Sequence, residues 1–580
     1  MTLSNLTLNI VPLGGLGEIG LNCLALEWAG QILVIDAGLM FPETSQLGVD
    51  IVIPDFSYLI ERADQVLGIV LTHGHEDHIG SVAYLAQTVK APIYGTRLTL
   101  ALAKERLDEA QAEDYELIEI KAKSQLTLGP FEIEFISVSH SIVDGVALAV
   151  TTPVGVLIHT GDFKLDLSAP PENRLDLYKF AQYGEKGVLI LLSDSTNAEV
   201  PGLTTSEKEV GEALTSIFQN APGRVILACF ASSVARLREV ARAARAAGRK
   251  LLFDGRSMIG IVQKAQELGY LTLGPNETVD LQAANNLADQ EIAVVATGSQ
   301  GEPLSALRRM AMGEHRYIQV RKNDTVVFSA RVIPGNERAI GDLVNLFHGL
   351  GANVVDRHLN KVHASGHGQV EELKLMLSLT RPKFFVPIHG EYRQLARHAA
   401  LAKEQGVAES DIFVLTNGQK LTLNERGQAI LAEPVQTGRW LVDGSRLASP
   451  SDPALKNRIR LAEIGMAIVV LALNVDQLQP VLLAPPLIEL INLIYENEPD
   501  LTLEATEATN LAFLAFSRDR DPGPLTEEEK KNLTESVRRE LRRRFKKAIN
   551  RKPLFLVRLI EVKTTTCIDE DYLKDMIDTI

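Results

Sequence analysis

Three histidines and one aspartate lie close together in the stretch His73-Gly-His75-Glu-Asp77-His78. An apolar run before this stretch predicts a buried strand, and apolar residues at helical spacing after it predict a helix. On an extended chain His73 and His75 point to the same side, whereas Asp77 and His78 lie where the chain turns and can point at a second position nearby. Imidazole and carboxylate are ligands that zinc takes in proteins. The stretch therefore predicts a site for two metal ions, in preference to a polar loop that is merely rich in histidine.

Three more candidate ligands follow predicted strands further along the chain. His140 ends a run of alternating apolar residues, whereas Asp162 and His389 each follow a mostly apolar run. Taken singly, each could be a polar residue at a strand end that faces water. Together with the histidine stretch they complete two sets of metal ligands. We expect His159, which lies within a strand, to be structural.

The segment 15–20, Gly-Leu-Gly-Glu-Ile-Gly, matches the glycine fingerprint of dinucleotide-binding proteins letter for letter. That fingerprint places a pyrophosphate at the start of a helix, so a helix must follow it. Here a strand-like apolar run follows. The segment therefore predicts a tight turn between two strands, and no nicotinamide site.

Composition limits the class of protein. The chain has 580 residues, 46% of them hydrophobic and 23% charged, which is typical of a globular protein with about three or four domains. Its three cysteines (Cys23, Cys229 and Cys567) are far apart, which fits a reducing cytoplasm and excludes a disulfide framework. We predict no signal peptide and no contact with a membrane. A net charge of −15 speaks against a protein coated in positive charge, but a local basic groove can still bind nucleic acid.

The ordered set of candidate residues resembles the metallo-beta-lactamase superfamily. Its five motifs match, in order, Asp36; His73, His75, Asp77 and His78; His140; Asp162; and His389. The long interval between the last two motifs resembles the beta-CASP branch of nucleic-acid hydrolases, in which a further domain is inserted there. The acidic motif of that branch matches Asp194 in Leu192-Ser-Asp194-Ser-Thr-Asn197, and its histidine motif matches His367 in His363-Ala-Ser365-Gly366-His367.

Within this branch the chain is similar to the ribonuclease J family. The matching motifs are Phe230-Ala-Ser-Ser233, Gly255-Arg-Ser-Met258, Thr297-Gly-Ser-Gln-Gly-Glu-Pro303, Ile333-Pro-Gly-Asn-Glu337 and Arg439-Trp-Leu-Val-Asp443-Gly444. The resemblance is dense over residues 1–445 and thin afterwards. The chain departs from the family pattern at Ala235, where a histidine is usual, and in the stretch that follows Gly444.

The resemblance implies an α/β fold: a metallo-beta-lactamase αββα sandwich, an inserted beta-CASP α/β domain and a small C-terminal α/β domain. We expect the first domain to comprise residues 1–204 and 371–445. The insertion would then comprise residues 205–370, and a linker and the C-terminal domain residues 446–580.

It also implies roles for the candidate residues. One metal is expected on His73, His75 and His140, the other on Asp77, His78 and His389, with Asp162 bridging and with Asp36 and Glu391 bracing the ligands from outside. The ions, with zinc preferred and manganese the alternative, would activate a water and clamp a phosphodiester. His367 would give a proton to the leaving oxygen. Asp77 and Asp194 are also expected to be catalytic residues.

The resemblance further suggests two binding sites beside the metals. A pocket for a 5′-monophosphate is expected from Ala231, Ser232, Ser233, His363, Ala364, Ser365, Gly366 and His367. The alternative for residues 230–233 is a plain helix cap. Gly48, Asp50 and Asp443 match positions where relatives can hold an additional calcium-like ion, although such ions prefer six or more oxygen ligands.

A charged segment near the C-terminus has several interpretations. An acidic start at residue 526 and a basic run over 538–552 predict a helix with a favourable dipole, followed by a strand over 554–562. The basic run could be a solvated helix face, a nucleic-acid contact or a subunit contact. The resemblance favours a domain that supports a homodimer or homotetramer.

The resemblance, together with the candidate ligands, predicts a metal-dependent ribonuclease that acts on single-stranded RNA in RNA maturation and decay. The resemblance implies 5′-to-3′ exonuclease activity that prefers 5′-monophosphate ends, together with internal cleavage. A hydrolase of a small ester or thioester on the same metals is the alternative, and a scaffold with a structural metal site is a second. The residues do not decide between RNA and DNA.

Overall fold

The structure is a computed structural model that describes residues 6–43, 45–284, 286–333, 335–356, 361–474, 479–494 and 498–562. The chain forms two compact units, which are described separately: Met1–Phe41 with Ile51–Val442, and Pro42–Asp50 with Asp443–Ile580. Cys567 lies outside the described residues. Among the described helices none is long and apolar enough to cross a membrane.

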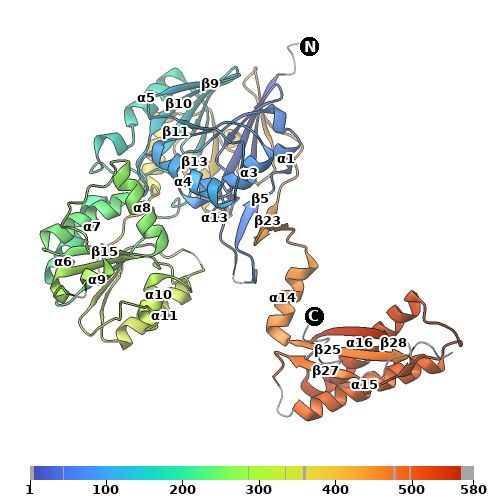
Figure 1. Cartoon of the computed structure of the whole chain (residues 1–580). Helices are drawn as coiled ribbons and strands as arrows, with labels where there is room; N and C mark the ends of the chain where they lie inside the picture. The colour runs from blue at the N-terminus through green and yellow to red at the C-terminus, as the bar shows by residue number, and fades with distance from the viewer. Residues whose placement is uncertain are drawn as a thin grey trace. The chain divides into compact units, whose positions relative to one another are not determined.

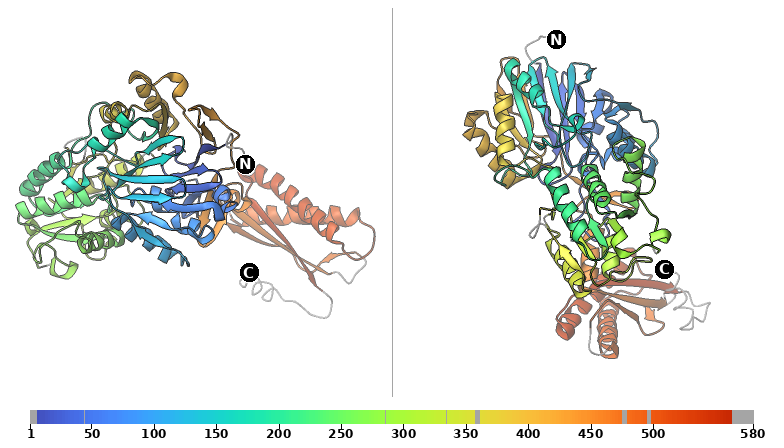
Figure 2. Two further views of the ribbon diagram at one scale, coloured as in Figure 1. Left: turned by 90° about the horizontal axis from the view of Figure 1, so that it is seen from above. Right: turned by 90° about the vertical axis from the view of Figure 1, so that its left-hand side faces the viewer.

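Two mixed sheets form the centre of the first unit (Figures 1 and 2). In spatial order the first contains β22 (Ala429–Leu431), β21 (Leu421–Asn424), β1 (Thr7–Gly14), β3 (Cys23–Trp28), β4 (Gln31–Ile35), β6 (Val66–Val70), β7 (Ile93–Gly95) and β8 (Leu117–Glu119). The second contains β19 (Phe384–Ile388), β13 (Val188–Asp194), β12 (Gly155–His159), β11 (Val146–Thr152), β10 (Phe131–Ser137) and β9 (Gln125–Leu128). Their facing side chains make one buried core.

Each central strand is buried on both faces. In β4, Leu33 and Ile35 enter the core between the sheets, whereas Ile32 and Val34 enter the core under the outer helices. Side chains alternate along a strand, so a strand covered on both sides reads as a continuous apolar run. This is why the strands beside the candidate ligands were visible in the sequence.

Helices cover the outer face of each sheet, which confirms the predicted αββα sandwich. On the first sheet lie α1 (Ser57–Ile60), α2 (Glu76–Ile79), α3 (Val82–Thr88) and α4 (Arg97–Glu109). On the second lie α5 (Leu177–Lys186), α12 (Val370–Thr380) and α13 (Tyr392–Glu404).

The inserted domain is a parallel sheet with helices on both faces (Figure 1). Its strands, in spatial order, are β15 (Lys250–Asp254), β16 (Ile292–Ala296), β14 (Val225–Ala228), β17 (Thr325–Phe328) and β18 (Asn353–Val355). One face packs on α6 (Glu207–Asn220), α7 (Val234–Ala246) and α8 (Arg256–Glu267). The other packs on α9 (Leu281–Ala284), α10 (Ala306–Ala311) and α11 (Glu337–Gly349). The boundaries at residues 204, 370 and 445 stay predictions.

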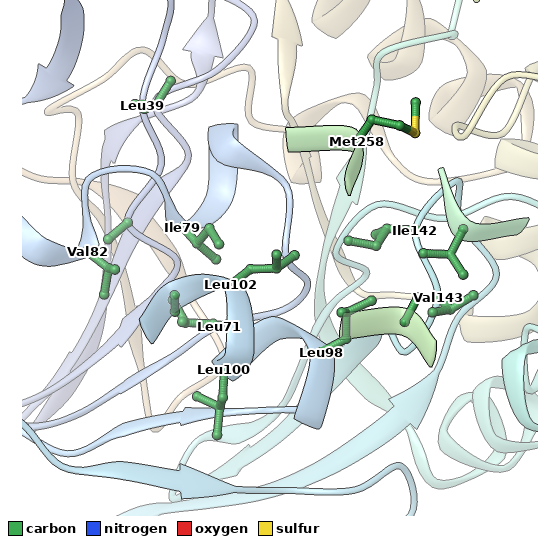
Figure 3. Close-up of a cluster of buried hydrophobic side chains, with 14 of the residues drawn as sticks. Leu39, Leu71, Ile79, Val82, Leu98, Leu100, Leu102, Ile142, Val143 and Met258 are labelled. Atoms are coloured by element: carbon green, nitrogen blue, oxygen red, sulfur yellow. The ribbon is translucent and has the colours of Figure 1, made fainter. Parts of the chain in front are cut away.

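One apolar cluster runs without a break from the outer helices of the first sheet into the insertion (Figure 3). Met258 of α8 is fully buried and belongs to the same cluster as Leu98 and Leu102 of α4 and Ile142 and Val143 of the loop after His140. The inserted domain is therefore packed directly against the loop that carries a candidate ligand.

The glycine-rich segment 15–20 lies between two antiparallel strands. Strands β1 and β3 pair with Pro12 opposite Leu24 and Gly14 opposite Cys23. Between β1 and β3 in the sequence, β2 (Leu16–Gly17) pairs with β20 (Gly390–Glu391). A separate strand pair of this unit joins β5 (Ile51–Pro54) to β23 (Arg439–Asp443). The predicted hairpin turn is confirmed, and no helix follows it.

The second unit is a small sheet with two long helices on one face. Its elements are β24 (Arg446–Ala448), α14 (Pro453–Ile464), β25 (Met466–Asn474), β26 (Val481–Leu482), β27 (Leu487–Ile491), α15 (Glu498–Arg518), α16 (Glu527–Ile549) and β28 (Leu554–Val562). Thr526 and Glu529 form a capping box at the start of α16, and Leu533, Val537 and Leu541 bury one stripe of it. The predicted helix and strand are confirmed.

Several arginines of the basic run pair with acids within this unit. Arg538 and Arg542 contact Glu535, and Arg544 contacts Glu504 of α15. These pairs favour the interpretation of a solvated helix face for the arginines that make them.

Two helical glycines offer a matched test of the sandwich packing. At Gly184 of α5 an added Cβ would lie 1.9 Å from the carbonyl oxygen of Leu379, whereas at Gly260 of α8 nothing lies within 4 Å. We expect Gly184→Ala to lower the thermal unfolding midpoint by roughly 2–10 °C, since the two helices must move apart. Gly260→Ala should leave it equal or slightly higher. Equal effects in a calorimetric scan would contradict this packing.

Candidate dinuclear metal centre

The candidate ligands lie at the ends of strands that belong to both sheets. His73 and His75 follow β6, and Asp77 and His78 lie in the short helix α2 directly afterwards. His140, Asp162 and His389 follow β10, β12 and β19 of the second sheet. Residues far apart in the sequence therefore meet at one edge of the sandwich.

The first group contains three histidines and Asp162. Nδ1 of His75 lies 3.1 Å from Nε2 of His73 and 3.0 Å from Nε2 of His140. Nε2 of His73 and of His140 each lie 3.6 Å from Oδ2 of Asp162. Three imidazole nitrogens converge here on one point beside a carboxylate.

The second group contains Asp77, His78 and His389, again with Asp162. Nε2 of His78 lies 3.3 Å from Oδ2 of Asp162, and Nε2 of His389 lies 3.3 Å from Oδ2 of Asp77. Asp162 is thus the member that the two groups share, as a bridging carboxylate would be.

The donor set fits two bound cations. Among the described residues, the buried atoms Asp162 Oδ2 and His389 Nε2 have no hydrogen-bond partner. Unpaired buried polar atoms are costly and call for a partner. A divalent ion in each group would supply it and would also separate the facing nitrogens of His73, His75 and His140.

The charge of the histidine rings distinguishes the two groups. Burial holds the pKa of His73 and of His140 well below its usual range and lowers that of His75 to about 4, so these rings are neutral and can donate lone pairs. At His389 burial also opposes the charged ring, but Asp162 outweighs it and raises the pKa to about 10. The second group therefore attracts positive charge.

Asp36 holds the start of the histidine stretch and the ring of His78 in position. Its carboxylate accepts hydrogen bonds from the main-chain N–H of Thr72 (2.7 Å) and from Nδ1 of His78 (2.7 Å). The second bond fixes the tautomer of His78 so that Nε2 faces Asp162. Asp36 and His389 both adopt left-handed backbone conformations (φ 63° and 52°), which residues other than glycine adopt infrequently.

Two glycines allow the loops to approach the ligands. An added Cβ at Gly38 would lie 1.7 Å from the carbonyl oxygen of Asp77. At Gly366 it would lie 2.5 Å from Cε1 of His140, and the Gly366 carbonyl accepts a hydrogen bond from Nδ1 of this ring (2.6 Å). The segment 363–367 is thus fixed against a metal ligand.

His367 and Asp194 lie directly beside the second group. Nδ1 of His367 is 2.8 Å from Oδ2 of Asp194, and both residues form a cluster with Asp162 and His389. Burial lowers the pKa of His367, but Asp194 and Asp162 outweigh it and the net shift is upward. A protonated ring is therefore favoured next to the ligands.

Two residues that the sequence analysis did not select order this segment. Nδ2 of Asn197 donates to Oγ of Ser365 and to the carbonyl of His367, both at 2.8 Å. The guanidinium of Arg331, which follows β17, donates to Oδ1 of Asn197. Asn197 lies in the quoted motif after Asp194, which was the available signal, whereas nothing local marked Arg331.

The remaining predicted pocket residues lie on two loops. Ser233 is the N-cap residue of α7, but its side chain makes no capping hydrogen bond, so a plain cap does not explain residues 231–233. In the described part of the chain neither ring nitrogen of His363 has a hydrogen-bond partner, and burial lowers its pKa to about 3. Ala364 is buried in the apolar cluster and supports the loop.

Glu391 and the residues of the expected additional ion have other contacts than the sequence analysis assumed. The carboxylate of Glu391 contacts Arg393 at the start of α13, and the described structure gives it no hydrogen bond to a predicted ligand. In the second unit the guanidinium of Arg458 contacts the carbonyl of Gly48 and the carboxylate of Asp443. Asp50 accepts from the main chain of Gly444 at 2.8 Å. A cationic side chain therefore already occupies the surroundings of the expected additional ion.

Family models match four successive parts of the chain. Metallo-beta-lactamase superfamily matches residues 17–193, and Ribonuclease J, beta-CASP domain, matches residues 222–347. Zn-dependent metallo-hydrolase RNA specificity domain matches residues 351–415, and Ribonuclease J C-terminal domain matches residues 453–562.

Curated relatives match over most of their length. Ribonuclease J of Synechocystis sp. is 41% identical over 99% of this chain and 89% of that protein. Ribonuclease J 1 of Streptococcus pyogenes is 40% identical over 88% of this chain and 91% of that protein. Ribonuclease J2 of Bacillus subtilis is 38% identical over 95% of this chain and 98% of that protein.

A comparison with solved structures shows a shared fold. The crystal structure of a protein of unknown function from Enterococcus faecalis V583 aligns with a TM-score of 0.51 and 15% sequence identity. The alignment covers 72% of this chain and 100% of that one.

Removal of single ligands tests the metal assignment. We expect His78→Ala and Asp162→Ala to lower the metal content after dialysis from about two ions per chain to one or none, and to abolish hydrolysis without unfolding the chain. The matched control is His348→Ala, an exposed histidine of α11. Elemental analysis and circular dichroism measure the two effects, and a folded His78→Ala variant with full metal content and normal turnover contradicts the assignment.

Proposed function

The chain belongs to the ribonuclease J family of metal-dependent ribonucleases, which process RNA, and from this premise we propose that it degrades single-stranded RNA from the 5′ end. In this proposal it prefers a 5′-monophosphate and also cleaves internally. The observation that supports it is the segment 363–367, which is hydrogen-bonded to the ligand His140 through the Gly366 carbonyl and places the ring of His367 beside Asp162 and His389.

The proposed reaction breaks the bond between phosphorus and the 3′ oxygen while a water oxygen bonds to phosphorus and the water releases one proton to the solvent. Two bound divalent ions would supply positive charge that polarises the phosphodiester and lowers the pKa of the water. The leaving 3′ oxygen takes a proton from His367. Asp194 holds Nδ1 of that ring at 2.8 Å, so Nε2 is the nitrogen that releases the proton.

Ser365 suits the binding of a terminal phosphate. Its Oγ accepts hydrogen bonds from Nδ2 of Asn197 (2.8 Å) and from the main-chain N–H of His367 (3.2 Å). Both acceptor positions are thus filled, which leaves the O–H of Ser365 to donate to a phosphate oxygen. Ser232 and Ser233, before α7, would contribute the other donors.

The donor set supports zinc as the metal of the proposed enzyme. Nitrogen-rich ligands favour zinc over manganese. We place the enzyme in the cytoplasm as a homodimer or homotetramer that uses the second unit. A calcium-like ion at Gly48, Asp50 and Asp443 is not included, because Arg458 contacts two of these residues.

One RNA labelled at its 5′ end tests the proposal. The monophosphate and triphosphate forms are incubated with the full chain, with and without chelator. We expect labelled mononucleotide, released faster from the monophosphate and abolished by chelator. His367→Ala should lower the rate about 10²–10⁴-fold. Internal fragments alone, equal from both forms, would refute the 5′ preference, and cleavage that persists in chelator would refute the metal dependence.

A further inference from the structure

Three charged side chains are almost wholly buried where the first domain meets the insertion. The exposed fractions of the side chains of Lys164, Glu207 and Arg236 are 1%, 10% and 2%. Burying charge is costly unless every partner is in place. None of the three is a metal ligand, and the proposed reaction assigns them no role.

Lys164 connects this network to the metal centre. It lies two residues after Asp162, and its main-chain N–H donates to the carbonyl of Ser139 (2.7 Å), the residue before His140. Its Nζ donates to Oε1 of Glu207 at 3.2 Å. Any shift of Glu207 therefore acts directly on the loops that hold two ligands.

Glu207 is the central member. As the first residue of α6 it donates its main-chain N–H to Oδ2 of Asp166 (2.9 Å), and its carboxylate lies between Lys164 and Arg236. Burial raises the pKa of this carboxyl, but the two cations outweigh it and hold it at about 2. The group is thus ionised at neutral pH.

Arg236 connects the network to the segment that contains the proton donor. From the first turn of α7 its Nε donates to Oε2 of Glu207 (2.9 Å). A terminal nitrogen donates to the carbonyls of Ser329 (3.0 Å) and Val362 (3.1 Å). Oγ of Ser329 also donates to Val362 (2.7 Å). Val362 directly precedes the segment 363–367.

We propose that Arg236 is a positioning residue that sets the distance between the metal ligands and the segment 363–367, acting through Glu207 and Lys164. This inference rests on the proposed function, because it concerns the proton donor and the phosphate contact of that reaction. A planar guanidinium can bind acceptors from three chain segments at once, which a lysine ammonium on a flexible stem cannot reproduce. A small misplacement of a reacting group lowers rates strongly.

The choice of substrate separates positioning from simple stability. Hydrolysis of RNA releases a ribose oxygen that needs a proton from His367. Hydrolysis of bis(p-nitrophenyl) phosphate releases p-nitrophenolate, a stable anion that leaves without a proton donor. The second substrate therefore reports the metal centre alone, and the ratio of the two activities reports the placement of the segment 363–367.

The experiment compares three variants of the full chain loaded with metal. We expect Arg236→Lys to lower kcat/KM for RNA, counted as total phosphodiester cleavage, by about 10- to 100-fold. Its bis(p-nitrophenyl) phosphate turnover and metal content should stay within about twofold of the parent. Ser329→Ala, which removes one hydroxyl of the connection, should show a smaller loss in the same ratio. Arg245→Lys is the matched control, since Arg245 lies on α7 in an exposed pair with Glu277.

Two results would overturn the inference: a loss in Arg236→Lys that is equal on both substrates, or undiminished RNA cleavage by both Arg236→Lys and Ser329→Ala. If Arg236→Lys fails to fold, the ratio in Ser329→Ala decides alone. If the unmodified chain cleaves RNA without preference for a 5′-monophosphate, the proposed 5′ specificity is wrong. The ratio of RNA cleavage to bis(p-nitrophenyl) phosphate turnover still tests the role of Arg236 in that case. The two failures are therefore distinguishable.

Discussion

A single buried carboxylate, Asp162, determines how this centre can be built. It is almost fully buried, and histidine nitrogens of both ligand groups approach its two oxygens. Such an arrangement is stable only if cations, or protons in their place, balance the charge and the facing lone pairs. The strand ends, the bracing of His78 by Asp36 and the close approach of Gly366 to His140 all serve to hold ligands around this group.

The inserted domain supplies what the metal ligands alone lack. In the proposed reaction the metal ligands polarise a phosphate, and His367 at the end of the insertion, the proposed proton donor, is held beside them by Asp194 and Asn197 of the first domain. After Val362 the chain leaves the insertion, and the segment 363–367 connects it to α12. We propose that the buried pair of Glu207 and Arg236 holds the chain at Val362 in position. This role would explain why charged side chains lie in a buried region where apolar residues are usual.

Much of the fold was predictable because its signals are local. Continuous apolar runs marked strands buried on both faces, and the spacing of His73 and His75 marked the ligand loop. Contacts between distant segments were not predictable: nothing near Arg331 or Arg236 indicates that these side chains meet Asn197 and Val362. For the same reason the sequence does not show that the carboxylate of Glu391, which was expected to brace the ligands, contacts Arg393 in α13.

Anomalous diffraction would show directly whether Asp162 lies between two metal ions. Crystals of the full chain grown with zinc or manganese would be measured at the absorption edge of the metal. We expect two peaks, roughly 3.5–4 Å apart, with Asp162 between them. One peak should lie among His73, His75 and His140, and the other among Asp77, His78 and His389. A single peak, or two peaks of which one lies out of reach of Asp162, would contradict the account.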